Sequence, residues 1–155
     1  MIKKGIILAG GSGTRLSPLT KSVNKQLLPI HDKPMIFYPL SVLMLANIRN
    51  VLMVVNPGQI NTFKGLIGDG SRFGIKIDYK VQDKPRGLPD AFNLGKSFIK
   101  NENVALILGD NFFHGSELIS KLQKAYTTDG ARIFVNEVKD PGRYGVAAVS
   151  YTQLT

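Results

Sequence analysis

The chain has 155 residues, no cysteine, 43% hydrophobic residues and a formal net charge of +9. This length suits one domain with a real core, and the apolar fraction is that of a globular chain rather than a disordered one. Without cysteine, disulfides and thiolate zinc sites are excluded. The longest apolar tract, PMIFYPLSVLMLA, has 13 residues, short of the roughly 20 that cross a bilayer. We therefore expect one domain over residues 1–155, cytoplasmic and without a membrane partner.

Strand-like and helix-like stretches alternate along the chain. Residues 5–9 (GIILA) predict a short buried strand, and 35–48 predict a helix that is apolar almost all round. A strand at 51–55, a helix at 60–68 and an alternating strand at 75–81 follow. The remaining pattern predicts a helix at 88–99, a strand at 104–108, a helix at 116–126 and a strand at 131–138. Such repeated units predict an α/β fold with a largely parallel sheet and helices on both faces.

The positive charge is concentrated near the N-terminus. Residues 1–40 hold six basic residues against one acid, which gives +5 of the total +9. Binding to nucleic acid, binding to a polyanionic small substrate and simple solubility are the competing explanations. The basic residues are scattered, and aromatic residues are not interleaved with them as on a base-stacking surface. We therefore expect no nucleic-acid partner.

A glycine-rich loop follows the first predicted strand, at the sheet edge where α/β proteins bind ligands. Gly10, Gly11 and Gly13 leave the backbone bare, so its N–H groups can face a phosphate, and Arg15 adds a fork of donors. The loop is not a Walker A sequence, and Leu16 stands where a dinucleotide fingerprint has its third glycine. A tight turn without a ligand would use the same glycines, so both interpretations stay open.

Other candidate residues gain weight from their positions. Lys25 is a second cation in a loop, where a solvated charge is the alternative. Asp110 ends the strand VALIL-GD and either holds Mg²⁺ together with phosphate oxygens or caps a turn. Gln82 follows a strand and either pairs with a nucleobase edge or faces water. His31 and His114 have no partner at ligand or triad spacing, so we expect both to be structural or exposed.

Several motifs in this order resemble the glucose-1-phosphate thymidylyltransferases, a family of sugar-phosphate nucleotidyltransferases. The motifs are KGIILAGGSGTRLSPLT, NKQLLPIHDKPMIFYPLSVLMLANI, LIGDGSRFGIKIDYKVQ, GLPDAF, LILGDNFF and DPGRYGV, and the similarity runs from about residue 3 to residue 149. The resemblance implies a three-layer, Rossmann-like nucleotide-diphospho-sugar transferase fold. It also implies the transfer of dTMP from dTTP to α-D-glucose 1-phosphate, with Mg²⁺ as cofactor, in dTDP-rhamnose biosynthesis. Complete relatives are homo-oligomers, often tetramers.

The resemblance also implies roles for individual residues. The nucleotide phosphates would lie beside Gly10, Gly11, Gly13 and Thr14. The triphosphate and the leaving pyrophosphate would contact the catalytic pair Arg15 and Lys25. Thymine would be read by Gln82, in a pocket shaped by Pro85 and Gly87, and Mg²⁺ would bind Asp110. The sugar or nucleoside would lie near Leu88, Asn111, Tyr144 and Gly145.

Two departures from the family pattern affect the interpretation. KPRGLPDA differs from the common G-L-A-Q-A, which could retune the sugar side. The last residues, YTQLT, leave the family pattern, and the E-K-P segment and a second metal-binding Asp are missing. We therefore expect the domain to be incomplete at its C-terminus. The alternatives are a dTTP-binding module with weak or no activity, and a sugar 1-phosphate nucleotidyltransferase that uses UTP.

Overall fold

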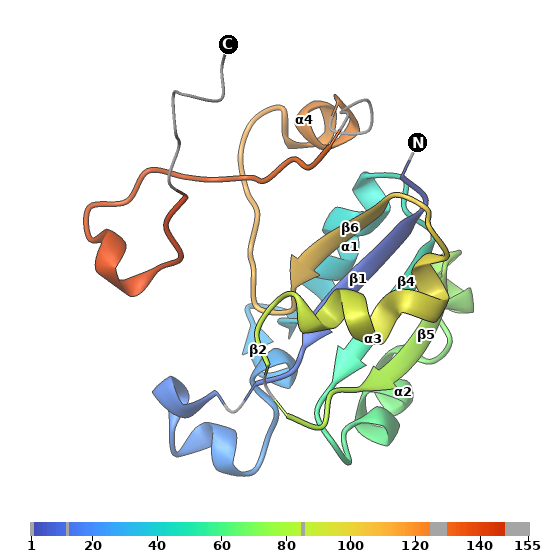
Figure 1. Ribbon diagram of the computed structural model, residues 1–155. Helices are drawn as coiled ribbons and strands as arrows, with labels where there is room; N and C mark the ends of the chain where they lie inside the picture. Colours follow the sequence, from blue (N-terminus) through green and yellow to red (C-terminus); the bar gives the residue numbers. More distant parts are fainter. Residues whose placement is uncertain (1, 12, 85, 125–129, 148–155) are drawn as a thin grey trace.

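A four-stranded parallel sheet forms the centre of the molecule (Figure 1). The computed structural model describes residues 2–11, 13–84, 86–124 and 130–147. The strand order is β5-β4-β1-β6, with β1 at Lys4–Ala9, β4 at Asn50–Val55, β5 at Lys76–Val81 and β6 at Val104–Leu108. Every pair in the sheet is parallel, and Ile7 lies opposite Met53 on one side and Ile107 on the other. The predicted parallel sheet is therefore confirmed.

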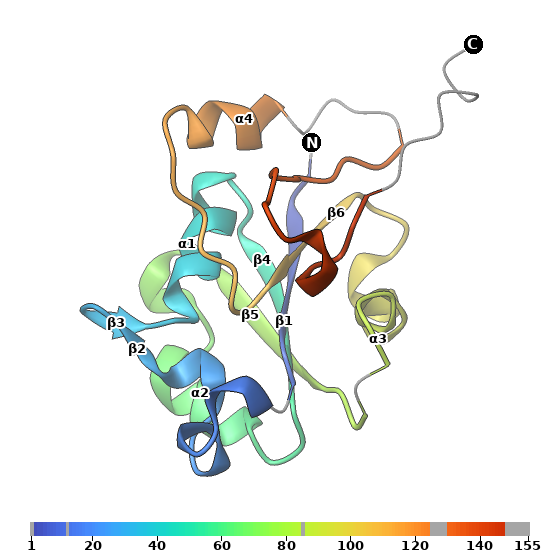
Figure 2. The same cartoon turned by 90° about the vertical axis from the view of Figure 1, so that its left-hand side faces the viewer.

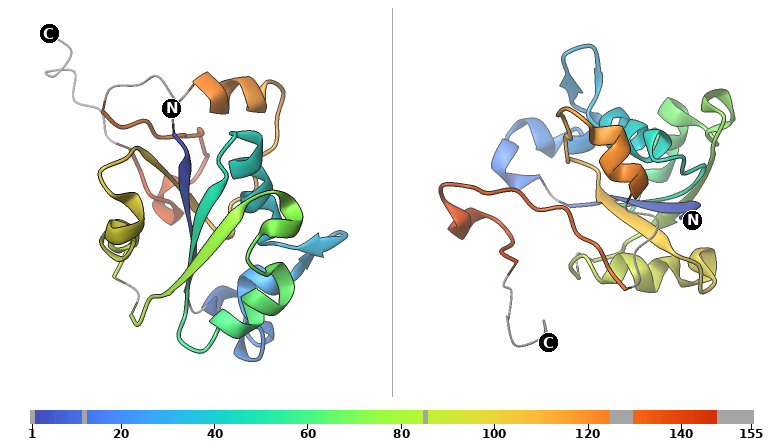
Figure 3. Two further views of the ribbon diagram at one scale, coloured as in Figure 1. Left: turned by 90° about the vertical axis from the view of Figure 1, so that its right-hand side faces the viewer. Right: turned by 90° about the horizontal axis from the view of Figure 1, so that it is seen from above.

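Helices cover both faces of this sheet, which makes three layers (Figures 2 and 3). The helices α1 (Phe37–Leu45) and α2 (Ile60–Ile67) lie on one face, and α3 (Asp90–Ile99) lies on the other. A fourth helix, α4 (Leu118–Lys124), adds Leu122 to the core on the α1 side. The shorter elements are β2 (Pro29–Ile30), β3 (Lys33–Pro34), η1 (Thr14–Leu16), η2 (Leu19–Lys21), η3 (Lys25–Leu27), η4 (Ser71–Phe73) and η6 (Pro141–Arg143).

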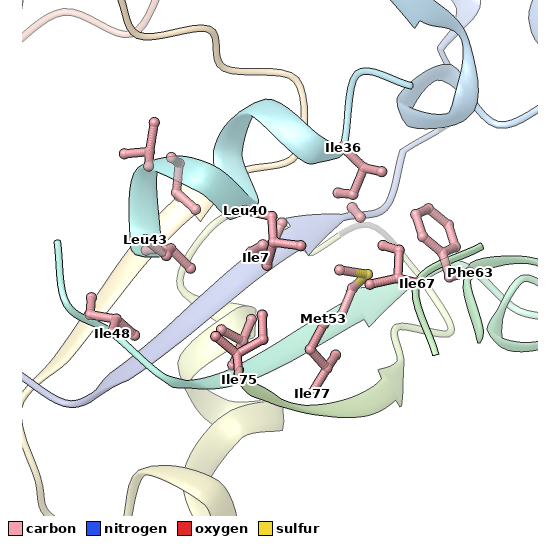
Figure 4. Packing of buried hydrophobic residues seen from close by; sticks show 14 of the residues in the cluster. Ile7, Ile36, Leu40, Leu43, Ile48, Met53, Phe63, Ile67, Ile75 and Ile77 are labelled. Atoms are coloured by element: carbon pink, nitrogen blue, oxygen red, sulfur yellow. The ribbon is translucent and has the colours of Figure 1, made fainter. Parts of the chain in front are cut away.

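Alternate residues of the strands build two cores. Ile7 and Met53 point into the larger cluster under α1 and α2, where Phe63 is fully buried (Figure 4). Their neighbours Ile6 and Leu52 point to the opposite face and pack beneath α3. Each fully buried aliphatic side chain stabilises the fold by about 1.5–3 kcal/mol. These two clusters therefore fix the position of the sheet edge at which the site lies.

The helix ends differ from the predicted ones for local reasons. The helix expected over 35–48 runs only from Phe37 to Leu45, with Pro39 in its first turn, where the missing N–H costs nothing. Its end is marked by Asn47, whose φ of 55° is in the left-handed region. On the other face, Gly95 lets α3 approach the sheet, because a Cβ there would lie 2.9 Å from Cδ1 of Ile6.

The predicted strand over residues 131–138 is wrong. These residues form neither strand nor helix and make an exposed segment that stands away from the sheet (Figure 1). The β-branched residues that suggested a strand, Ile133 and Val135, are 69% and 71% exposed. A strand needs a partner as well as suitable side chains, and among the described residues β6 ends the sheet without pairing to this segment. Phe134 makes an edge contact with Phe113, with ring centroids 6.4 Å apart.

Candidate functional site

The carboxyl ends of all four strands deliver polar groups to one edge of the sheet. The glycine loop follows β1, Asn56 follows β4, Gln82 follows β5, and Gly109-Asp110 follows β6. Backbone bonds extend the ladder into these segments, because Gly109 N–H donates to the Leu8 carbonyl at 2.9 Å and Gln82 N–H donates to that of Val55 at 2.8 Å. This edge is where ligands bind in open α/β sheets.

The glycines of the loop are required by its geometry. Gly11 and Gly13 have φ values of 111° and 60°, which glycine adopts without steric cost. Asn56 clamps the loop, because its Nδ2 donates to the Gly11 carbonyl at 2.9 Å and its Oδ1 accepts from Gly11 N–H at 3.0 Å. A Cβ on Gly10 would lie 3.1 Å from that Oδ1, and one on Gly13 would lie 2.8 Å from Thr20 Cγ2. The loop is therefore a tight turn, and this geometry is compatible with either interpretation, with a bound phosphate or without one.

Beside this loop lies a cavity of about 270 Å³. The glycine loop, the segment that begins η3 and the end of β6 supply its lining, which is Gly10, Gly11, Gly13, Thr14, Arg15, Leu16, Lys25, Gln26 and Asp110. Two lining residues are cations and one is a carboxylate. Arg15 is exposed, and its guanidinium makes no hydrogen bond or ion pair within the described ranges. The structure therefore brings together the seven residues predicted for the phosphates, the catalytic cations and the metal.

Lys25 and Asp110 form an ion pair in the lining of the cavity. The Lys25 Nζ lies 2.8 Å from Asp110 Oδ2, and the two side chains are 30% and 33% exposed. Lys25 is held by its neighbours, because the side chain of Asn24 caps η3 by accepting a hydrogen bond from Gln26 N–H at 2.9 Å. The cavity thus has a lysine already directed at its only lining carboxylate.

Sequence reasoning missed two residues of this site. Gln26 is only 4% exposed, its Nε2 donates to the Gly10 carbonyl at 3.4 Å, and its Oε1 has no hydrogen-bond partner. A buried acceptor without a partner is costly, so it needs an explanation. Asn56 begins the sequence Asn-Pro-Gly, which is typical of an ordinary turn. Its position directly after a buried strand, as for Asp110 and Gln82, is the signal that could have found it.

Two other predicted site residues, Gln82 and Asn111, follow strands at this edge. Gln82 is 5% exposed and its Nε2 donates to Asp90 Oδ2 at 2.9 Å. Asn111 directly follows Asp110, and its N–H donates to the Leu108 carbonyl at 3.1 Å. Among the predicted site residues that the structure describes, those that do not line the cavity are Gln82, Gly87, Leu88, Asn111, Tyr144 and Gly145.

The outlying positions differ in exposure. Leu88 and Tyr144 are 48% and 64% exposed. Pro85 lies outside the described residues. His31 and His114 are both exposed, as expected.

The donor set suits a magnesium ion that arrives with a ligand. No group of three or more His, Cys, Asp or Glu residues that could hold a metal occurs in the described part of the chain. Mg²⁺ commonly binds through one or two carboxylates, several waters and the phosphates of a substrate. Asp110 is partly exposed and lines a cavity together with the glycine loop, Arg15 and Lys25, so it fits that mode.

The fold and the position of the cavity place the molecule among the Rossmann-like α/β domains. The chain belongs to the nucleotidyl transferase family, whose model matches residues 4–154. Across the described helices, none is long and apolar enough to cross a bilayer.

The chain is similar to several known thymidylyltransferases. It is 58% identical over 144 residues to the glucose-1-phosphate thymidylyltransferase of Neisseria meningitidis, and 48% identical over 143 residues to that of Mycobacterium tuberculosis. Each alignment covers 92% of this chain and 50% of the relative, so the chain spans about half the length of these curated relatives. The resemblance to this family that the sequence motifs indicated is therefore confirmed.

Solved structures show the same fold. A Bacillus anthracis structure assigned as a glucose-1-phosphate thymidylyltransferase has a TM-score of 0.85 at 36% identity and covers 96% of this chain and 60% of its own. A UDP-glucose pyrophosphorylase complexed with UDP-glucose has a TM-score of 0.63 at 28% identity, and covers 82% of this chain and 54% of its own. The expected nucleotidyltransferase fold is therefore confirmed.

Proposed function

We propose that this chain forms the nucleotide-binding part of a glucose-1-phosphate thymidylyltransferase, which transfers dTMP from dTTP to α-D-glucose 1-phosphate. The observation that carries the proposal is the cavity in which a bare glycine backbone, Arg15, Lys25 and Asp110 meet. Relatives at 48–58% identity that carry this activity support the choice of substrates. The product would be dTDP-glucose, with pyrophosphate as the other product.

In this reaction an oxygen of the sugar phosphate attacks the α-phosphorus of dTTP. The new P–O bond forms as the bond to the oxygen bridging the α- and β-phosphorus breaks, and the electron pair leaves with pyrophosphate. No protein nucleophile is needed, so the chain contributes positioning and charge. Arg15 and Lys25 would neutralise the triphosphate and the leaving group, while N–H groups of the loop, including Gly11 and Gly13, would face the phosphates.

The metal would be held by Asp110 and by the nucleotide's own oxygens. When bound, Mg²⁺ supplies charge neutralisation between the attacking and leaving phosphates. Lys25 would turn from Asp110 toward the phosphates as that carboxylate is engaged, because the distance of 2.8 Å leaves no room for an ion between them. A lysine side chain has the flexible stem that such a movement needs.

The other site residues would contact the nucleoside and the sugar. We propose that Gln82 reads thymine, with Pro85 and Gly87 beside the base. Leu88, Asn111, Tyr144 and Gly145 would lie nearer the sugar. For the whole protein we propose a homo-oligomer acting in the cytoplasm in dTDP-rhamnose biosynthesis. Light scattering on the complete protein tests the oligomer.

Calorimetry followed by a pyrophosphate-release assay tests the proposed function. The chain is titrated with dTTP in the presence of Mg²⁺, and glucose 1-phosphate is then added. Binding with release supports the complete reaction, whereas binding without release supports the alternative of a dTTP-binding module. Absence of dTTP binding overturns the proposal.

A pair of variants sharpens the test. Arg15→Ala should lower dTTP affinity, and turnover should fall about 10²-fold if the chain is active, the scale of losing one preorganised donor. Lys76→Ala is the control, because it removes one charge at the amino end of β5, away from the cavity. Equal effects of the two variants would mean that Arg15 acts only through net charge. A preference for UTP over dTTP in the same assay would favour the uridylyl alternative.

A further inference from the structure

Gln82 and Asp90 form a buried side-chain pair at the edge of the site. Gln82 directly follows β5 and is 5% exposed, while Asp90 is the first residue of α3 and is 8% exposed. Gln82 Nε2 donates to Asp90 Oδ2 at 2.9 Å. Both residues are fixed by secondary structure, because Gln82 N–H also donates to the Val55 carbonyl and Asp90 opens a helix. This pair joins the β5 edge to the first turn of α3.

The pair determines which end of the Gln82 carboxamide faces Asp90. An ionised carboxylate has only acceptors, whereas a carboxamide has an NH₂ donor end and a carbonyl acceptor end. Only the NH₂ end can therefore bond to Asp90, and Oε1 is left for another partner. The second Asp90 oxygen, Oδ1, lies 3.8 Å from Nη1 of Arg86.

The free carbonyl of Gln82 faces the glycine loop. A Cβ built on Gly10 would lie 3.2 Å from Gln82 Oε1. Within the described ranges this oxygen accepts no hydrogen bond. The orientation thus presents an acceptor beside the loop that lines the cavity, and it withholds the donor.

We propose that Asp90 is a positioning residue that makes the site select a pyrimidine with a ring N–H. This inference rests on the proposed nucleotide-binding function. Thymine and uracil carry a donor at N3, which matches the Gln82 carbonyl. Cytosine carries an unprotonated N3, whose lone pair would face that carbonyl with no hydrogen bond between them. A site that leaves such polar groups unpaired rejects the wrong ligand strongly.

Binding of dTTP and dCTP with Mg²⁺ to the same chain, measured by calorimetry, tests this inference. In Asp90→Ala the carboxamide is free to rotate and can offer its NH₂ end, so the ratio of dTTP to dCTP affinity should fall about tenfold or more. Asp90→Asn should lower the ratio less than Asp90→Ala does, because the asparagine amide can still accept from Gln82 Nε2 but can also donate to its Oε1. A purely structural role would weaken both nucleotides equally and leave the ratio unchanged.

A double-mutant cycle isolates the path through Gln82. Gln82→Ala should lower the ratio by itself, and adding Asp90→Ala to it should change the ratio no further. The reciprocal exchange, Gln82→Glu with Asp90→Asn, places the donor on residue 90 and leaves a carboxylate oxygen for the base. The ratio of dTTP to dCTP affinity should be higher in this double variant than in the single Gln82→Glu variant. This comparison tests the inference even if Asp90→Ala fails to fold.

The outcomes separate this inference from the proposed function. If the unaltered chain binds neither nucleotide, the proposed function fails and this inference fails with it. If the chain prefers dTTP and folded Asp90→Ala keeps the full ratio, the positioning role alone is wrong. Failure of the reciprocal exchange to restore the preference in a folded protein overturns it as well.

Discussion

Replacing Gln26 with methionine should separate the stability of the fold from ligand binding. Gln26 is 4% exposed and buries an Oε1 that has no partner. Methionine has a similar unbranched shape and no polar oxygen, so it can fill the same space. Gln26→Met should therefore stabilise the protein while it weakens dTTP binding, if the free oxygen serves a ligand donor.

The magnitude follows from two opposing terms. Burying an unpaired acceptor costs about 1–3 kcal/mol, and removing it recovers this amount. The hydrogen bond from Nε2 to the Gly10 carbonyl is lost, but at 3.4 Å it is long and contributes about 0.5 kcal/mol. The free energy of unfolding should rise by about 0.5–2.5 kcal/mol, which corresponds to a Tm increase of roughly 1–10 °C at about 2–4 °C per kcal/mol for this chain length.

Urea unfolding and calorimetry measure the two effects. The dTTP affinity should fall about tenfold, the value of one hydrogen bond. Gln123→Met is the control, because Gln123 is exposed on α4 and should change neither quantity by much. A folded Gln26→Met protein that is destabilised by more than about 1 kcal/mol, with unchanged dTTP affinity, would show that Gln26 is an ordinary structural residue.

Three further changes test other parts of the structure. Lys25→Ala should lower dTTP affinity about 10- to 100-fold in calorimetry. It should change the free energy of unfolding by less than about 1 kcal/mol, because the ion pair of Lys25 with Asp110 is partly exposed. A large loss of stability would contradict this expectation. Gly13→Ala should destabilise the loop by about 1–3 kcal/mol and weaken binding, because its φ is 60° and a Cβ would meet Thr20 at 2.8 Å; unaltered urea unfolding and binding would refute it. Burial and the nearby charge of Asp69 raise the pKa of Tyr79 from 10.0 to about 12, so its stabilising contribution is complete below pH 10 and is lost as the pH rises through 12. Unfolding as a function of pH should show Tyr79→Phe losing its deficit against the unaltered protein in that interval, and a constant difference would exclude the effect.

The order of elements could be predicted from the sequence because burial leaves a local pattern. The runs at 51–55 and 104–108 are apolar at every position, as strands covered on both faces must be. Strand order leaves no such pattern, and the arrangement β5-β4-β1-β6 emerges only in the structure. The segment 131–138 shows the limit of this reasoning, because β-branched residues indicate suitability for a strand and do not supply its partner.

The charged residues of the site could be predicted from their residue type and from their positions relative to the predicted strands and the glycine loop. Arg15, Lys25 and Asp110 were identified from the sequence and line one cavity in the structure, although their chemical roles stay predictions. The roles of Gln26 and Asp90 could not be predicted, because each depends on a contact with a distant part of the chain or across a turn. A buried oxygen without a partner, or a carboxylate that orients an amide, is visible only when the side chains are placed.

The cavity joins segments that are far apart in the chain, since Lys25 and Asp110 are separated by 85 residues. They belong to the loops after β1 and β6, which are neighbours in the sheet. A nucleotide held by both loops would remain bound only while these two strands stay hydrogen-bonded to each other. Occupancy should thus slow amide hydrogen exchange in the paired strands themselves, at Ile7 and Ile107, and not merely in the flanking loops.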